Sequence, residues 1–205
     1  MARPPDTTRQ RIVKAAVELF ADHGFDGTSV RAIVTKARVN QAAVNYHFQG
    51  KDGLYLAVLK AAFEAYTHDE MSREQAEALP AHEALRHFVH QQLRPLLGRD
   101  DMSRYMRIFA WESVRPTAVM RKFIVTSATP FVGQAVSLVK RFLPDASEQD
   151  LVCGAIWLMG QCSVFVRNRE HFAHPPFGLK VDEGFVDRLT DLVTGLALQG
   201  LVHKA

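Results

Sequence analysis

The chain has 205 residues, of which 47% are hydrophobic and 23% charged, which is enough apolar material to bury one sizeable core or two small ones. It holds no run of about 18 apolar residues and no export signal at its start, so we expect a cytoplasmic protein with no membrane partner. The net charge of +3 is uneven, because residues 1–60 hold nine Lys and Arg against five Asp and Glu. This basic N-terminal part is weak evidence for a polyanionic partner, since solvated helix faces give similar counts.

Apolar residues recur with the period of an amphipathic helix in every long segment, which predicts an all-α fold. Residues 12–20 carry a single apolar stripe, and the stretch HGFDGT ends this first helix. Thr28 is expected to cap a second helix, and Asn40 a third one that runs through Phe48. A bundle of three such short helices buries little area, so it needs a neighbour to be stable.

Beyond this bundle the same reasoning predicts six further helices, at residues 51–77, 81–97, 101–115, 117–142, 148–170 and 183–202. Breaks rich in Pro, Gly and Asp separate them. We therefore expect one helical domain over residues 1–50 and a larger helical domain over residues 51–205.

The third predicted helix has one apolar face and one exposed polar face. Val44 and Phe48 are four residues apart and can pack inward, whereas Gln41 and Asn45 lie on a stripe that need not be buried. Gln and Asn can each make two hydrogen bonds to the major-groove edge of adenine, and an alanine such as Ala42 can touch a thymine methyl group. The face is therefore typical of one that reads base edges.

Tyr46 and His47 lie where this helix would leave a DNA groove. Their hydroxyl and ring N–H groups can donate to phosphate, and Lys51 adds a positive charge at the start of the next helix. The alternative is that Tyr46, His47 and Phe48 form a small aromatic core. We expect this for Phe48 and favour DNA contact for the other two.

The stretch RIVKAAVELFADHGFDGTSVRAIVTKARVNQAAVNYHFQGKDGL resembles the DNA-binding segment of the TetR family of bacterial transcriptional regulators. The order of helix, Gly-x-x-Gly-Thr, helix, short turn and Tyr-His-Phe-x-x-Lys is specific to that segment. The resemblance implies a helix-turn-helix over residues 28–48, with residues 40–48 as the recognition helix. It assigns base contacts to Arg31, Gln41, Ala42, Ala43 and Asn45. It assigns phosphate contacts to Thr28, Tyr46, His47 and Lys51.

One position departs from the family pattern, because the turn usually holds Gly where this chain has Arg38. If this residue takes the left-handed conformation, Arg costs about 1 kcal/mol more than Gly. We expect the turn to form at that cost.

The larger predicted domain resembles the family less closely, through the stretches RIFAWESVRPTAVMRKFI and GQCSVFVRNREHF, which are similar to ligand-domain helices of one subgroup. Effector pockets combine an apolar lining with a few placed polar groups. The candidates are polar or aromatic residues in otherwise apolar helices: Arg107, Trp111, Glu112, Phe131, Trp157, Gln161 and Arg167. Taken singly, each is better explained as core packing or as part of a salt bridge.

Residues 151–166 are apolar nearly all round, so this helix must be covered on both sides. Members of the family dimerise through their last two long helices, and the last one here carries an apolar face with small Gly195 and Gly200. The expected homodimer interface contains Leu158, Phe165, Leu189, Leu192 and Leu196. The alternative is core within one chain, and we favour a shared role.

Catalytic chemistry is not predicted. His87 and His90, and likewise His171 and His174, are three residues apart, but no Cys or carboxylate set completes a metal site beside them. The stretch GKDG lacks the remaining residues of a phosphate-binding loop, and no nucleophile has a base beside it in the sequence. We expect no catalytic residue, no metal and no cofactor.

These observations predict an all-α, homodimeric regulator with an N-terminal three-helix DNA-binding domain and a larger effector-binding and dimerisation domain. The expected function is repression, with release from a pseudo-palindromic double-stranded operator by a small organic effector. An activator, or a regulator without an effector, fits the same pattern. The alternative class is a helical small-molecule-binding protein or enzyme whose basic N-terminus is incidental.

Overall fold

The computed structural model describes residues 7–67, 73–97 and 100–202, and this part of the chain is helical without any strand, which confirms the all-α class. The chain forms two compact units. The first combines Met1–Ala65 with Asp100–Ser127, and the second combines Tyr66–Arg99 with Ala128–Ala205. The domain boundary expected at residue 50 lies inside the first unit.

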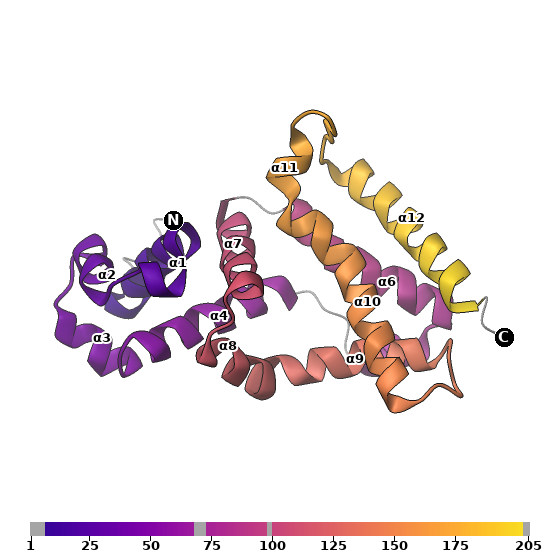
Figure 1. Cartoon of the computed structure of the whole chain (residues 1–205), viewed down its shortest axis with the longest axis horizontal. Coiled ribbons are helices and arrows are strands. Elements are labelled where there is room, and N and C mark those ends of the chain that lie inside the picture. The colour runs from indigo at the N-terminus through magenta and orange to yellow at the C-terminus, as the bar shows by residue number, and fades with distance from the viewer. Residues whose placement is uncertain (1–6, 68–72, 98–99, 203–205) are drawn as a thin grey trace, which may run out of the picture. The chain divides into compact units, whose positions relative to one another are not determined.

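The first unit is built mainly from α1 (Thr8–Gly27), α2 (Val30–Ala37), α3 (Gln41–Phe48), α4 (Lys51–Thr67), α7 (Asp100–Val114) and α8 (Ala118–Phe123). In Figure 1, α2 and α3 lie beside α1, and contacts join these three helices to one another. Thr7 caps α1 through a reciprocal pair of hydrogen bonds with Gln10. Ile12, Ala16 and Phe20 form the buried stripe that the sequence predicts.

The stretch HGFDGT does not end the first helix at Gly24. The helix bends at Gly24, and α1 then continues to Gly27, where it ends. Gly24 has φ +69°, and a Cβ at this position would lie 3.1 Å from the Trp111 indole. The same indole donates its N–H to the Ala21 carbonyl at 3.1 Å. The bend therefore seats α7 directly on α1.

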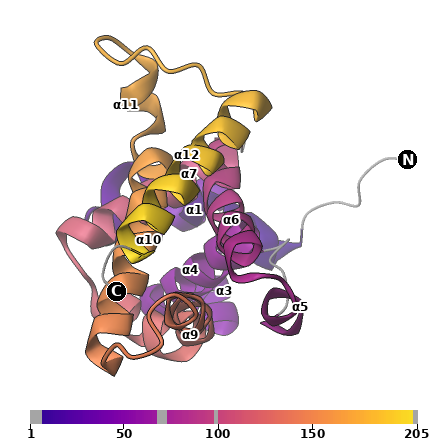
Figure 2. The same ribbon diagram turned by 90° about the vertical axis from the view of Figure 1, so that its right-hand side faces the viewer.

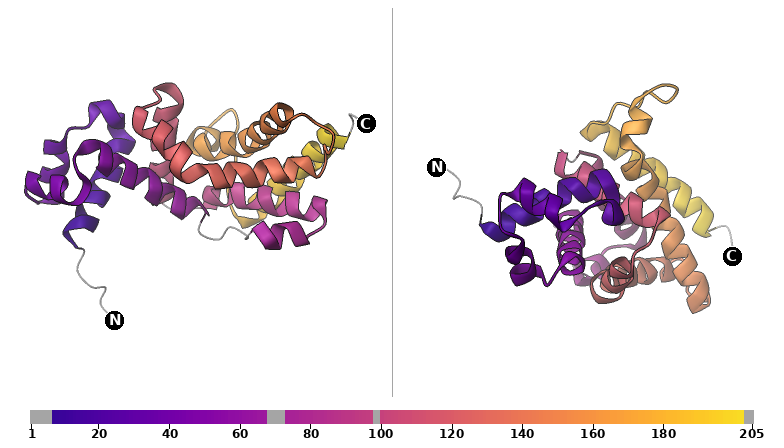
Figure 3. Two further views of the ribbon diagram at one scale, coloured as in Figure 1. Left: turned by 90° about the horizontal axis from the view of Figure 1, so that it is seen from below. Right: turned by 60° about the vertical axis from the view of Figure 1, so that its left-hand side comes forward.

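The second unit contains α5 (Arg73–Ala78), α6 (Ala81–Leu93), the 3-10 turn η1 (Arg94–Leu97), α9 (Thr129–Lys140), α10 (Glu148–Arg167), α11 (Arg169–Ala173) and α12 (Glu183–Val202). α12 packs along α6, and α10 packs on both α6 and α9 (Figure 2). The loop between α11 and α12 extends away from these helices (Figure 3).

Several predicted helices are shorter in the structure than in the sequence pattern. The helix expected at 117–142 is divided into α8, a π-helical turn η2 (Ile124–Ala128) and α9, because Pro130 in the first turn of α9 cannot donate to the preceding turn. The helix expected at 51–77 appears as α4 and α5, and residues 68–72 between them lie outside the described residues.

Two segments, Ala118–Lys140 and Glu148–Arg167, are long and apolar enough to cross a membrane by length and composition alone. Neither segment is the unbroken apolar run that the sequence is expected to lack, because each contains several charged residues. Core helices of water-soluble proteins pass the same test, which makes this weak evidence for a membrane span. The first of the two segments is also interrupted by η2.

Candidate nucleic-acid interface

The first element of the candidate interface is the capped turn from α1 into α2. Ser29 caps α2, since its hydroxyl accepts from the Ala32 N–H at 3.1 Å. The neighbouring Thr28 is buried, and its hydroxyl is directed at the Leu19 and Gly24 carbonyls at 3.0 and 2.8 Å. The predicted cap at Thr28 is therefore wrong. Its predicted phosphate contact is also wrong for the side chain, because this hydroxyl is out of water and already engaged.

The turn between α2 and α3 has the predicted left-handed residue. Arg38 has φ 54° and ψ 51°, and its N–H bonds back to α2. The guanidinium of Arg11 on α1 donates to the carbonyls of Ala37 and Arg38 at 2.6 and 2.7 Å. These bonds satisfy the C-terminal carbonyls of α2 and hold the strained turn in place. Asn40 caps α3, as predicted, by accepting from the Ala42 N–H at 3.0 Å.

The α3 helix is anchored on one face and free on the other. Val44 is completely buried and Phe48 nearly so, as their spacing predicts. On the opposite side Gln41 and Asn45 are exposed, and Tyr46 is 85% exposed. This exposure rules out the aromatic core for Tyr46, whose ring instead meets the edge of the half-buried His47 ring at 4.9 Å between centroids.

The remaining predicted contact residues lie around this exposed face. Ala42 and Arg31 are exposed, and Ala43 is half-buried. Lys51 begins α4 after two residues with positive φ, Gln49 and Gly50. Its ammonium lies 4.1 Å from the centroid of the Phe25 ring, a cation–π contact that fixes the side chain at the start of the helix.

Arg9, which was not singled out from the sequence, lies next to the end of α3. Its guanidinium lies 5.3 Å from the centroid of the Phe48 ring, which places a cation from α1 beside the buried end of α3. In the sequence Arg9 is indistinguishable from any solvated residue in a first helical turn. Lys36, in contrast, is paired with Glu18 at 2.7 Å, and this hydrogen bond holds the pKa of Glu18 below its ordinary value.

The seven effector-pocket candidates do not form one site. Three of them are in the first unit: Arg107, Trp111 and Glu112. Arg107 bonds to Asp22 at 3.2 Å, and Trp111 packs on α1. Glu112 is buried and accepts three hydrogen bonds. In the second unit a cavity of about 380 Å³ lies between α5, α6 and α9. Phe131, Trp157, Gln161 and Arg167 are in the same unit, and none of them lines it.

The five predicted interface residues divide between core and surface. Leu158 is completely buried and Leu189 is 6% exposed within the chain, so both belong to its own core and the prediction for them is wrong. Leu192 and Leu196 on α12 are 59% and 57% exposed. Phe165 is half-buried and packs on Phe172 at 5.9 Å between ring centroids. Exposed apolar residues of α10 that were not predicted at the dimer interface are Val152, Ile156, Trp157 and Val164.

Among the side chains that the structure describes, no three His, Cys, Asp or Glu residues are grouped as metal ligands. His90 instead pairs with Asp187 on α12 at 3.5 Å. In the first unit, the exposed face of α3 together with the cations near it is an arrangement that can engage a polyanion.

Two family models match the chain. The model of the bacterial regulatory proteins of the tetR family matches residues 12–58. The model of the C-terminal domain of the HTH-type transcriptional dual regulator CecR matches residues 81–201, which is more than half of the chain. The chain belongs to the TetR family of bacterial transcriptional regulators. The predicted family is therefore confirmed, and the match at its N-terminus contains the turn and the α3 helix described above.

Relatives match this regulator over different lengths. The dual regulator CecR of Shigella flexneri is 24% identical, over 98% of this chain and 95% of CecR. The transcriptional repressor NicS of Pseudomonas putida is 32% identical over 88 residues, and the chain spans only 41% of the length of NicS. The solved structure of AibR, in complex with isovaleryl coenzyme A and operator DNA, superposes with a TM-score of 0.65 at 20% identity, over 93% of this chain and 97% of AibR. This last likeness shows the fold alone.

Proposed function

We propose that this TetR-family regulator is a cytoplasmic homodimer that binds a pseudo-palindromic double-stranded DNA operator as a repressor and is released by a small organic effector. It has no catalytic role and needs no cofactor in this proposal. The observation that carries it is the division of α3 between buried Val44 and Phe48 and exposed Gln41, Asn45 and Tyr46. A helix fixed on one side and polar on the other can enter a major groove without unfolding anything.

Base reading is assigned to the exposed side chains of α3. The amide groups of Gln41 and Asn45 are one turn apart and can bond to the edges of neighbouring bases, while Ala42 leaves room for a methyl group. Arg31 on α2 and half-buried Ala43 complete this group.

Phosphate contact is assigned to the residues around this face. The Tyr46 hydroxyl and the His47 ring lie at the end of α3, and the Lys51 ammonium lies at the N-terminus of α4. Arg9 supplies a further cation that the sequence did not single out. Because cationic side chains make part of these contacts, the affinity for DNA should fall as the salt concentration rises.

A two-fold dimer is supported by the exposed apolar face of the last two long helices. Leu192 and Leu196 on α12 and Ile156 on α10 are each more than half exposed. A Cβ at Gly160, Gly195 or Gly200 would meet no atom within 4 Å in the described part of the chain, so another helix can approach closely there. The two α3 helices of such a dimer must lie about 34 Å apart to enter successive major grooves on one face of B-DNA. Because the dimer is two-fold symmetric, its operator is pseudo-palindromic.

Release by an effector is supported by the cavity in the second unit and by the relatives. NicS is named a repressor, and AibR is known in complex with both a coenzyme A ester and operator DNA. An effector lowers operator affinity only if it binds the free dimer better than the bound one. CecR is named a dual regulator, so activation at some promoters is the second candidate function.

The proposal is tested with fluorescence anisotropy on labelled DNA from upstream of the coding sequence of this protein, with scrambled DNA of the same length as control. The proposal predicts preference for the upstream DNA and a linear fall of log affinity with log salt concentration. Equal affinity for both DNAs would favour the alternative class, a helical binding protein or enzyme with an incidental basic N-terminus. Transcription from the same promoter in vitro separates repression from dual regulation.

A further inference from the structure

The cavity of the second unit is bordered by helices that are fixed to one another by contacts within the chain. It has a volume of about 380 Å³, which is within the size range of small-molecule sites. The Arg141 guanidinium, directly after α9, donates to the carbonyls of Ala76 in α5 and of Leu79 after it. Phe88 on α6 stacks on Phe131 of α9 at 6.1 Å between ring centroids. The walls of the cavity are therefore joined before any ligand enters.

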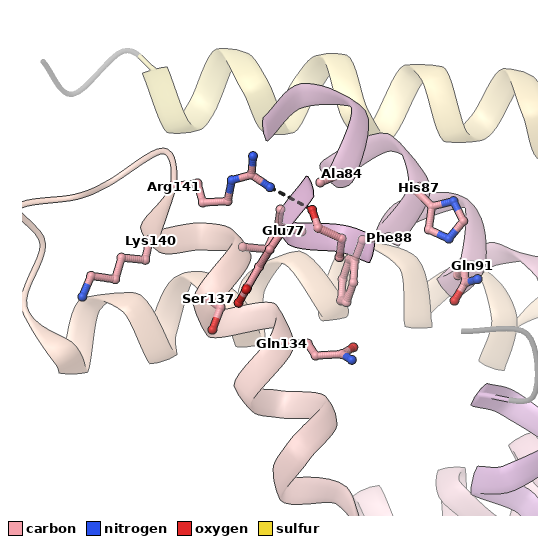
Figure 4. Close-up of a pocket in the computed structure, with 11 residues that line it drawn as sticks. Glu77, Ala84, His87, Phe88, Gln91, Gln134, Ser137, Lys140 and Arg141 are labelled. Atoms are coloured by element: carbon pink, nitrogen blue, oxygen red, sulfur yellow. Dashed lines mark hydrogen bonds between the residues drawn. The ribbon is translucent and has the colours of Figure 1, made fainter. Parts of the chain in front are cut away.

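The inner part of the lining is apolar, with a few uncharged polar groups. Its apolar residues include Phe88 and the buried Ala84 and Leu138. Gln134 and Ser137 on α9 are half-buried, and in Figure 4 Phe88 and Gln134 extend into the space between α6 and α9. A charged ligand group placed among these residues would lose its water without meeting an opposite charge. This part of the cavity therefore suits the apolar body of a ligand.

His87 also lines the cavity and adds no charge to it. Its Nε2 atom is buried, which closes this atom to a ligand. Burial, and then the neighbouring His90, hold the pKa of His87 below its ordinary value. The ring is therefore mainly neutral at pH 7, and the charge of the cavity is set by other residues.

The charged residues of the lining are at its exposed edge, and their charges do not cancel. Glu77, Lys140 and Arg141 are all exposed, so that one carboxylate is set against two cations. Figure 4 shows the Lys140 side chain directed away from the other labelled residues. A lysine ammonium is carried on a flexible stem of four carbons, so it can turn toward a ligand. The edge is net positive by one charge.

Arg141 is the fixed cation of this edge. Its two hydrogen bonds go to neutral carbonyl oxygens, so they hold the guanidinium in place and leave its charge uncompensated. A guanidinium has five N–H donors, and the remaining ones are available to a ligand. An anionic group at the edge can therefore accept a charge-assisted hydrogen bond while it stays partly in water.

We propose that this cavity binds an amphipathic organic anion, with its apolar body against Phe88 and Leu138 and its carboxylate, or a similar anionic group, at Arg141 and Lys140. Glu77 lines the same edge and repels such a group, so the net attraction is that of a single positive charge. The inference rests on the proposed function only in giving the ligand the role of effector. None of the seven pocket residues predicted from the sequence lines this cavity.

The test uses the full-length protein and two pairs of probes that differ mainly in charge. The aromatic pair is 2-naphthoate with neutral 2-naphthamide, and the chain pair is octanoate with neutral octanamide. Affinities are measured by isothermal titration calorimetry at pH 7, first at low salt and then at rising salt. Thermal unfolding confirms that each protein variant is folded.

Four variants separate the charge of the edge from the space of the cavity. Lys140→Gln and Glu77→Gln change the charge of the edge in opposite directions. Arg188→Gln is the matched control for Lys140→Gln, because Arg188 is exposed on α12 and does not line the cavity. It changes the total charge of the protein by the same amount. Ser137→Phe places a large side chain in the cavity itself.

The inference predicts that at least one anion binds the wild type roughly two- to fivefold more tightly than its amide, the size expected for an exposed ion pair. This preference should shrink as salt screens the edge. Lys140→Gln should weaken binding of the anion and Glu77→Gln should strengthen it, whereas Arg188→Gln should leave it unchanged. The affinity of the amide should be nearly the same in these three variants, and Ser137→Phe should remove binding of both probes.

Four outcomes would overturn the inference. They are binding of neither anion, an amide that binds as tightly as its anion, a folded Lys140→Gln that behaves like Arg188→Gln, and full binding in folded Ser137→Phe. DNA affinity is measured separately on the same samples. A protein that binds the anion but no DNA would count against the proposed function and leave the ligand assignment standing.

Discussion

The hydroxyl of Tyr55 on α4 donates to the carboxylate of Glu112 on α7 at 2.7 Å, and both side chains are buried. The same carboxylate accepts the N–H and the hydroxyl of Thr117 at 2.7 and 2.9 Å. Burial, and then the bond to Glu112, raise the pKa of Tyr55 above its ordinary value, so the donor stays protonated. The helix α4, which follows α3 in the chain, is thereby fixed to α7 within the first unit.

Tyr55→Phe should therefore destabilise the protein by about 1 to 2 kcal/mol, because a buried carboxylate oxygen loses one of its donors. Urea unfolding followed by circular dichroism measures this difference. Tyr46→Phe is the matched control, since Tyr46 is exposed, and it should change stability by less than about 0.5 kcal/mol. Equal effects of the two substitutions would show that the Tyr55 bond contributes nothing specific.

Arg38→Gly should stabilise the protein. The left-handed backbone at Arg38 costs a residue with a Cβ about 1 kcal/mol more than Gly, and the Arg11 bonds are made to backbone carbonyls that remain. We expect a gain of roughly 0.5 to 1 kcal/mol in the free energy of unfolding, measured in urea, after the greater freedom of Gly in the unfolded chain is counted. Thr35→Gly is the control and should destabilise, because exposed Thr35 lies in the last turn of α2, where Gly is unfavourable. A loss of stability in Arg38→Gly would show that the turn carries no such strain.

Lys51→Ala should weaken binding to upstream and scrambled DNA alike, because the ammonium is assigned to a phosphate. The slope of log affinity against log salt should become shallower by about one unit for each subunit, hence by about two for a dimer. Lys60→Ala, an exposed cation on the same helix, is the control. An unchanged slope for Lys51→Ala would remove this residue from the interface.

Leu196→Glu should prevent dimerisation and with it operator binding, since it places a charge in the exposed apolar face of α12. Multi-angle light scattering measures the mass, and anisotropy the DNA affinity. Ala118→Glu adds the same charge at an exposed helix start in the first unit and should leave the mass unchanged. A monomeric wild type would contradict the dimer directly.

The local sequence pattern was sufficient to predict the buried face and the N-terminal cap of α3. The four-residue spacing of Val44 and Phe48 predicted which face of α3 is buried. Asn40 was predicted as the cap because it is a good capping residue directly before the helical segment. At the start of α2 two adjacent residues, Thr28 and Ser29, can both cap. Tertiary burial of Thr28 decides between them, and no local pattern contains that information.

Sequence was less informative for the second unit, because several of its helices are apolar on more than one side. Leu189 and Leu192 look alike in the sequence, yet one is core and the other is exposed. The cavity was missed for the opposite reason. His87, Gln134 and Ser137 resemble residues of solvated helix faces, and only the packing of α6 against α9 turns them toward a shared space.

Sequence-specific DNA reading by α3 is tested most directly by the ratio of affinities for upstream and scrambled DNA, measured by anisotropy for the wild type, Gln41→Ala and Asn45→Ala at one salt concentration. We expect each variant to lose roughly 1 to 3 kcal/mol of binding free energy on the upstream DNA and almost nothing on scrambled DNA, so that the ratio of affinities falls. Equal losses on both DNAs, or an unchanged ratio in both variants, would contradict base reading by this helix.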